Sequence, residues 1–157
     1  MKKLYLFNPE NDMALASGSP YYMAPASAKK MANDLAVLPA WYADAGSEIL
    51  VGDSRQVDWL RDGCRLSLPV TGVLSVTDEY EEIIPWGWSP ALKHRLGMDM
   101  VRGVDVETLR GLSSRMTAVN LLPKLRIEGT IGESSWLTSL ENVSAFSLKH
   151  DRVLLKA

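Results

Sequence analysis

Residues 3–12 read KLYLFNPEND, a run of large apolar side chains followed directly by a polar loop that we expect to extend to residue 20. A short apolar run that ends in turn-forming residues is typical of a buried strand. A helical pattern covers residues 25–38, and residues 48–52 and 54–61 repeat the order of strand and helix. This alternation predicts an α/β protein with a Rossmann-like parallel sheet and helices on both faces.

The later segments continue the pattern. Strands are expected at residues 64–68, 73–76 and 83–86, and helices at residues 90–96, 105–111 and 113–122. Ser89 followed by Pro90 is a helix-start signal, and Gly97 marks the end of that helix. A capping-box pattern at residues 138–141 predicts one more helix, and residues 153–157 have the composition of a buried strand.

The order of these elements predicts the domain organisation. We expect a Rossmann-like domain over residues 1–112, a linking helix over residues 113–126 and the start of a second, α+β domain over residues 127–157. The strand predicted at residues 153–157 has no turn or polar tail after it, although a buried strand needs neighbours. We therefore interpret the chain as the N-terminal piece of a longer protein.

Composition excludes several classes of function. The 157 residues are 46% hydrophobic, which is enough for a domain core, and the net charge of -2 without a basic cluster argues against a nucleic-acid partner. The apolar run at residues 4–7 is too short for a signal peptide or a spanning helix, so we expect a cytoplasmic protein with no membrane partner. A lone Cys64 and two distant histidines predict neither a disulfide nor a metal site, and Cys64 is expected to be buried filler.

The loop after the first strand is the densest polar cluster. In a doubly wound sheet, ligands bind beyond the carboxyl ends of the strands. Asn8, Glu10, Asn11 and Asp12 are therefore candidate substrate-binding residues, with side chains that can bind an amine, hydroxyl groups or a hydrated cation. The alternative is that these residues only build a turn with local hydrogen bonds.

Two indole rings flank a glycine at residues 86–88, directly before a helix start. Trp88 is a candidate substrate-binding residue that would shape a cleft, although packing in the core or at a domain interface is the commoner fate of such rings. The chain contains neither of the two common phosphate-binding patterns, GxGxxG and GxxxxGK[ST], which argues against a dinucleotide site. It also lacks GxSxG, which argues against serine-based hydrolysis.

Lys156 is the third candidate, because a lysine among apolar neighbours in a buried strand must meet an anion or reach solvent. A nucleotide phosphate would satisfy its charge. The alternative is that Lys156 simply faces solvent at the end of a strand.

Together these segments resemble the front of an ATP-grasp ligase, and more closely a group of bacterial ATP-grasp-like proteins that begin with a strand and an FNPEND-type loop. The closer resemblance is carried by residues 7–12 and by residues 86–90, which read WGWSP. Ser113-Ser114-Arg115 is similar to the family's small-polar-lysine helix start. Residues 153–157, VLLKA, are similar to the family's strand that presents a nucleotide-binding lysine. The resemblance covers the whole chain in order, with short motifs.

The resemblance implies a pre-ATP-grasp domain, a linking helix and the beginning of an ATP-grasp domain. It also implies a parent enzyme that uses ATP and Mg²⁺ to activate a carboxylate as an acyl phosphate and joins it to an amine or another nucleophile. Lys156 and Arg115 would contact ATP, although Arg115 stands where the family commonly has lysine. The family's glycine-rich loop and magnesium-holding residues would lie beyond Ala157, so we expect the chain alone to bind no cofactor and to be inactive.

Two alternatives accompany this interpretation. The chain can instead be a stand-alone Rossmann-like domain that binds a small polar ligand at residues 8–12 or serves as an interaction module, without catalysis. An unpaired sheet edge at the final strand would also allow two copies to pair, which predicts a homodimer.

Overall fold

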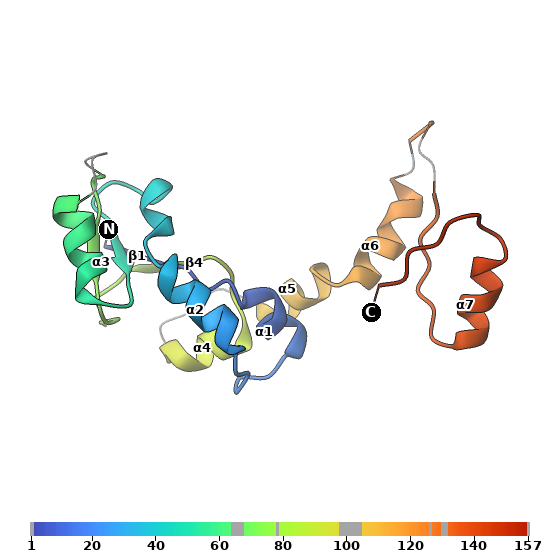
Figure 1. Cartoon of the computed structure of the whole chain (residues 1–157), viewed down its shortest axis with the longest axis horizontal. Helices are drawn as coiled ribbons and strands as arrows, with labels where there is room; N and C mark the ends of the chain where they lie inside the picture. Colours follow the sequence, from blue (N-terminus) through green and yellow to red (C-terminus); the bar gives the residue numbers. More distant parts are fainter. Residues whose placement is uncertain are drawn as a thin grey trace. The chain divides into compact units, whose positions relative to one another are not determined.

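The computed structural model describes residues 2–63, 68–77, 79–97, 105–125, 127–129 and 132–156. The chain divides into two compact units, Met1–Gly111 and Leu112–Ala157, which we call unit 1 and unit 2 (Figure 1). The division falls next to the boundary predicted at residue 112. None of the helices in the described ranges combines the length and the apolar character that crossing a bilayer requires.

Unit 1 is built on a four-stranded parallel sheet. Its strands are β1 (Lys3–Leu6), β2 (Glu48–Leu50), β3 (Thr71–Val73) and β4 (Glu82–Pro85). They lie in the order β3-β2-β1-β4, with Leu4 of β1 aligned with Glu48 on one side and Ile83 on the other. The predicted α/β class with a parallel sheet is confirmed. Because β2 and β3 extend the sheet on one side of β1 and β4 on the other, the winding reverses between β1 and β4.

Side-chain alternation in the strands places one core cluster on each face of this sheet. Tyr5 and Ile49 belong to a cluster that packs against the 3-10 turn η1 (Leu38–Trp41) and the π-helical turn η2 (Trp59–Gly63) through Ala40 and Leu60. A second cluster contains Leu4, Leu6, Ile83 and Leu92, the last from helix α4 (Pro90–Leu96). Helical segments therefore cover both faces, as the pattern of elements predicted.

Unit 1 contains five α-helices among its described residues, and some of them start or stop at residues that carry end signals. They are α1 (Asn11–Ser17), α2 (Ala26–Asp34), α3 (Ser54–Asp58), α4 and α5 (Val106–Leu112, which ends at the first residue of unit 2). The Ser89 hydroxyl accepts a hydrogen bond from Leu92 N at 3.3 Å, and Gly97 ends α4 with φ 82°. Asp53 accepts from Gln56 N at the start of α3. The helix predicted at residues 90–96 is confirmed.

Two predictions for unit 1 are wrong. Residues 11–17 form α1 rather than a loop: the helix begins without a side-chain cap, which removes the usual start signal, and ends at Gly18 with φ 67°. The third strand lies at residues 71–73 rather than 73–76, because Val51 N donates to Val73 O and sets the pairing there. Most of the strand expected at residues 64–68 lies outside the described residues, and Leu68 belongs to no strand.

The apolar stripe predicted for the helix after residue 25 is covered only in part. Ala28 is buried, whereas Met31 is 50% exposed and Leu35, which follows α2, is 44% exposed. Ala36, beyond the helix end, packs in the same cluster as Ile49. The helix therefore meets the core mainly through its start and through the turn after its end.

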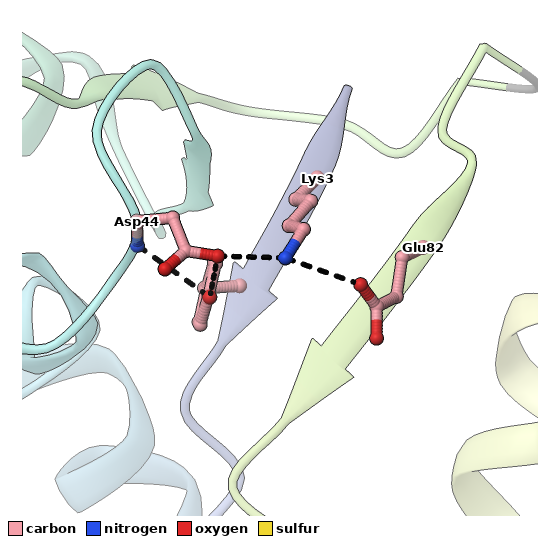
Figure 2. A network of polar contacts seen from close by, with 4 residues as sticks. Lys3, Asp44 and Glu82 are labelled. Atoms are coloured by element: carbon pink, nitrogen blue, oxygen red, sulfur yellow. Dashed lines mark hydrogen bonds and ion pairs between the residues drawn. The ribbon is translucent and has the colours of Figure 1, made fainter. Parts of the chain in front are cut away.

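A polar network fastens the beginning of β1 to its neighbours (Figure 2). Lys3 Nζ lies 2.7 Å from Asp44 Oδ2 and 3.4 Å from Glu82 Oε2, and the Tyr5 hydroxyl donates to the same Asp44 oxygen at 3.2 Å. The hydrogen bond from Lys3 lowers the pKa of Asp44, and the same bond raises the pKa of Lys3. The network joins β1, β4 and the segment before β2 at the amino ends of the strands.

Unit 2 contains helices, two of which begin at serine residues that cap them. They are α6 (Arg115–Leu121), the 3-10 turn η4 (Leu122–Lys124) and α7 (Leu140–Ser147). Ser114 Oγ accepts from Met116 N, and Ser139 Oγ accepts from Asn142 N, each at 3.2 Å. The predicted helices are confirmed, and Ser114 caps α6. The cap of α7 is Ser139 rather than Thr138, the first residue of the predicted capping box. None of these three elements buries a side chain.

The strand predicted at the end of the chain is wrong for the residues that are described. Residues 152–156 form no regular element, and Leu154 and Leu155 are 79% and 61% exposed. A parallel or buried strand needs a partner strand, and the described part of unit 2 contains none. The identity of residues 127–157 as the start of an ATP-grasp-like domain stays a prediction, as does a dimer through a free sheet edge.

Candidate functional site

The candidate site lies where the winding of the sheet reverses, at the carboxyl ends of β1 and β4. These strands are neighbours, and Leu6 is aligned with Pro85 at their ends. The loop after β1 carries residues 7–10, and the loop after β4 carries residues 86–89. In doubly wound sheets this reversal opens a crevice between the two loops, which is the usual place for a ligand.

Asn8 holds the two loops together. Its Nδ2 donates to Gly87 O at 2.8 Å, and Gly87 N donates back to Asn8 Oδ1 at 3.3 Å. Trp86 N donates to Leu6 O at 2.9 Å, so the Asn8 side chain continues the pairing of β1 and β4 by one more step. Asn8 is 2% exposed, and a buried amide with both ends bonded is fixed in position. We call this pairing of Asn8 with Gly87 the loop clamp.

Asn11 lies against the same glycine. A Cβ atom at position 87 would overlap with the Asn11 amide, so Gly87 is required by close approach. Asn11 N donates to Asn8 O at 3.1 Å, which turns the chain from β1 into α1. Asn11 is 8% exposed. The first two asparagines after β1 are thus both buried and both directed to the loop after β4.

Two acceptor atoms in the loop after β1 lack a donor. Among the described residues, Glu10 Oε2 and Asn11 Oδ1 are buried and form no hydrogen bond. A buried polar atom without a partner costs roughly 1–3 kcal/mol, so such atoms are uncommon in folded proteins. Glu10 as a whole is only half-buried, so a rotation of its side chain can bring the carboxylate to the surface. These oxygens are suited to a ligand that offers hydrogen-bond donors.

The other predicted residues of this region differ in their exposure and in their contacts. Asp12 is exposed in the first turn of α1. Trp88 is half-buried and packs against the cluster of Leu4 and Leu92, as the packing alternative predicted. Trp86 is the exposed indole at 58%, and its ring meets Phe7 edge-on with centroids 5.5 Å apart. If an indole at this site touches a ligand, Trp86 has the available surface.

The two residues predicted to contact ATP both lie in unit 2. Arg115 is exposed at the start of α6, and Lys156 is exposed in the segment without regular structure. Both carry the charge that a phosphate requires. Within the described ranges, no three side chains among His, Cys, Asp and Glu lie close enough together to hold a metal ion.

Sequence reasoning missed parts of the site that only the fold brings together. Gly87 was noted only as the residue between two indoles, although its peptide group is half of the loop clamp. Ser89 was recognised as a helix cap, and the structure adds that this residue is buried at 2% exposure. The available signal was the glycine itself, because a glycine between two large side chains indicates close approach of another group.

Comparisons with known proteins do not extend these observations: no protein-family model, no curated protein and no solved structure matches the chain. The resemblance to ATP-grasp ligases therefore stays a prediction from the motifs at residues 7–12, 86–90 and 153–157.

Proposed function

We propose that the loop clamp and the residues beside it bind a small polar molecule, and that in a longer parent protein this molecule is the non-nucleotide substrate of an ATP-dependent ligase. The observation that carries the proposal is the pair of buried acceptors without donors, Glu10 Oε2 and Asn11 Oδ1, at the reversal point of the sheet. Asn8 and Gly87 hold the loop that presents them.

The chemistry of the acceptors selects the kind of ligand. A carboxylate accepts hydrogen bonds only, and an ammonium group offers three donors and an opposite charge. Asn11 can accept one of those donors through its carbonyl oxygen. A molecule with an amino group therefore fits the loop better than an anion does, and this agrees with a ligase that joins a carboxylate to an amine.

The test is a thermal-shift screen of the intact chain with the common amino acids as probes, followed by calorimetric titration of each hit. The matched variants are Glu10→Gln and Asp12→Asn, which each remove one negative charge from neighbouring positions. We expect Glu10→Gln to weaken binding about tenfold or more, because charge-assisted bonds contribute about 1.5–3 kcal/mol. Asp12→Asn should change binding much less, since Asp12 is exposed at the surface of α1.

Absence of any binding in the screen, or equal weakening by the two variants, would contradict the proposal for this loop. The assignment as a ligase needs a separate experiment. Magnesium-ATP is titrated into this chain and into the longest form that the gene encodes, with Lys156→Ala as the variant. Binding by the longer form alone, lost in that variant, supports the ligase.

A stand-alone small-ligand-binding domain is the second candidate, and one observation favours it. The loop clamp and both unpartnered acceptors lie in unit 1, which also contains the sheet and both core clusters. Arg115 and Lys156 lie in unit 2, on the surface. Amino-acid binding without any binding of magnesium-ATP by either form would favour this second candidate.

A further inference from the structure

A second hollow lies beyond the carboxyl end of β2, apart from the loops that carry Asn8 and Gly87. It is an open depression in the surface, with a volume of about 410 Å³. Its lining comes from the end of α2, from the loop after β2 and from α3 and the turn that follows it. The lining residues are Asn33, Asp34, Val37, Asp53, Arg55, Gln56 and Trp59. Its place at the carboxyl edge of the sheet is again where α/β proteins bind ligands.

Side-chain bonds to the backbone join the elements that line this hollow. Gln56 Oε1 accepts from Gly52 N at 2.7 Å, and Gln56 Nε2 donates to Asn33 O at 2.5 Å. The Asn33 side chain lies so close over Gly52 that a Cβ there would overlap with it. These bonds join the end of α2 to the start of α3, so the walls need little rearrangement to receive a ligand.

Asp53 and Arg55 form a polar wall of the hollow. Both can form more hydrogen bonds than the ones they make within the chain. Asp53 accepts from Gln56 N at 3.1 Å and from Arg55 Nη2 at 2.7 Å, while a carboxylate has about four acceptor positions. Arg55 has five N–H groups, and its side chain is 89% exposed. Donors and acceptors are therefore both available beside each other on one wall.

The lining carries two carboxylates, Asp34 and Asp53, and one guanidinium, that of Arg55. Each carboxylate has a basic partner: Asp53 is paired with Arg55, and Asp34 with Lys30, which lies one turn earlier in α2 and outside the lining. With each carboxylate paired, the wall has no strong preference for an anion or a cation. A neutral ligand whose groups both donate and accept, such as a hydroxyl-rich molecule, matches the wall best.

The remaining wall is aromatic. Trp59 is 37% exposed, and its ring lies beside that of Trp41 at a centroid distance of 5.9 Å. An indole face packs well against the C–H groups on one side of a sugar ring, because that side is apolar and slightly positive. Hydroxyl groups at the ring edge would then reach Asp53 and Arg55.

We propose that this hollow binds a sugar ring through two neighbouring hydroxyl groups, with Trp59 under the ring and with Asp53 and Arg55 at the hydroxyls. The ring can belong to a free sugar or to the ribose of a nucleoside, since both offer the same pair of hydroxyls. This proposal does not depend on the amine site at Glu10 and Asn11.

The test follows the indole N–H signals of the five tryptophans in ¹H–¹⁵N spectra of the intact chain, with Trp59 identified from the variant Trp59→Phe. The probes are methyl β-D-ribofuranoside, methyl α-D-glucoside and adenosine. The control is 2′-deoxyadenosine, whose furanose ring lacks one of the two neighbouring hydroxyls. The matched variants are Arg55→Gln and Arg61→Gln, because both arginines are exposed and paired with nearby aspartates, but Arg61 does not line the hollow.

We expect a saturable shift of the Trp59 signal with at least one probe, about tenfold weaker binding in Arg55→Gln, and no change in Arg61→Gln. Binding of adenosine alone would identify a nucleoside as the source of the ring, and binding of a simple sugar would identify a free sugar. Absence of a saturable shift up to about 100 mM, far above the roughly millimolar Kd of a weak site, overturns the proposal. Equal binding of adenosine and 2′-deoxyadenosine, or equal effects of the two arginine variants, also overturns it.

Discussion

Unit 1 and unit 2 both contain helices with serine caps, but they differ in what those helices cover. In unit 1, α4 starts at Ser89 and places Leu92, 3% exposed, in a core cluster of the sheet. In unit 2, α7 starts at Ser139 in the same way, yet its first residue, Leu140, is 86% exposed. Local signals specify where a helix begins in both units, whereas a buried core is seen only for unit 1 in the described part of the chain.

The difference teaches where a functional site can form. A site needs side chains held within fractions of an ångström, and such precision comes from packed elements. The loop clamp and the hollow beside Trp59 both rest on the sheet of unit 1. The helices of unit 2 are short, and isolated helices of this length are marginal without packing.

Truncation of a core side chain should give the largest difference in stability loss between the two units. Leu4 is 0% exposed at the centre of the sheet, and Leu4→Ala should lower the free energy of unfolding by about 2–5 kcal/mol. The matched variant Leu140→Ala should change it by less than about 0.5 kcal/mol, because Leu140 is almost fully exposed. Urea unfolding followed by circular dichroism measures both. Equal losses would show that α7 is packed as firmly as β1.

Introducing a side chain at position 87 should produce the next largest effect. Gly87→Ala forces the Asn11 amide away and strains the loop clamp, with an expected cost of about 1–3 kcal/mol. Gly111 in α5 has no atom near its missing Cβ, so Gly111→Ala should be neutral or stabilise by up to about 1 kcal/mol. A neutral Gly87→Ala would mean that the clamp does not hold the loop closely.

Removal of the two serine caps gives a smaller and more specific contrast. Ser89→Ala should lower global stability by about 0.5–2 kcal/mol, because α4 is part of the core of unit 1. Ser139→Ala should reduce helix content but leave the midpoint of global unfolding unchanged, since α7 buries no side chain. Urea unfolding reports the first effect, and circular dichroism at 222 nm reports the second. A shifted midpoint for Ser139→Ala would place α7 in the cooperative core.

The smallest effect concerns Tyr80 and high pH. Burial, and then its hydrogen bond to Glu48, raises the pKa of Tyr80 from 10.0 to about 12. The folded chain keeps the phenol proton that the unfolded chain loses above pH 10, so this contribution to stability falls between pH 10 and pH 12. Urea unfolding at several alkaline pH values should show that the free energy of unfolding falls less steeply with pH in Tyr80→Phe than in the unchanged chain. An identical pH dependence would remove Tyr80 as a cause.

The sequence was informative wherever an element carries its own signals. The helix of residues 90–96 was predicted to the residue from Ser89, Pro90 and Gly97, and the strands β1 and β4 from their apolar runs. Helix α1 was missed because it starts at Glu10 without a side-chain cap. The final strand was predicted from composition, but strand formation depends on a partner that the described part of unit 2 does not contain.

The candidate site was predictable only in part. Asn8, Glu10 and Asn11 could be recognised as a polar group after the first strand, because the position of a loop after a strand can be read from the sequence. Their role in binding stays a prediction. The pairing of Asn8 with Gly87 joins positions far apart in the chain, and it depends on β4 lying beside β1. The hollow beside Trp59 was not predicted, because its residues come from two helices that only the fold brings together.

The most direct test of the central claim, that the packed fold and its candidate site belong to unit 1, is amide hydrogen exchange across the intact chain at neutral pH. Amides bonded within the sheet and the clamp, such as Trp86 N, Val51 N and Gly87 N, should be the most protected. Amides of α6 and α7 should exchange much faster. Equal protection of α7 and β1 would contradict the account, because it would show that unit 2 is packed as well as the sheet that carries the site.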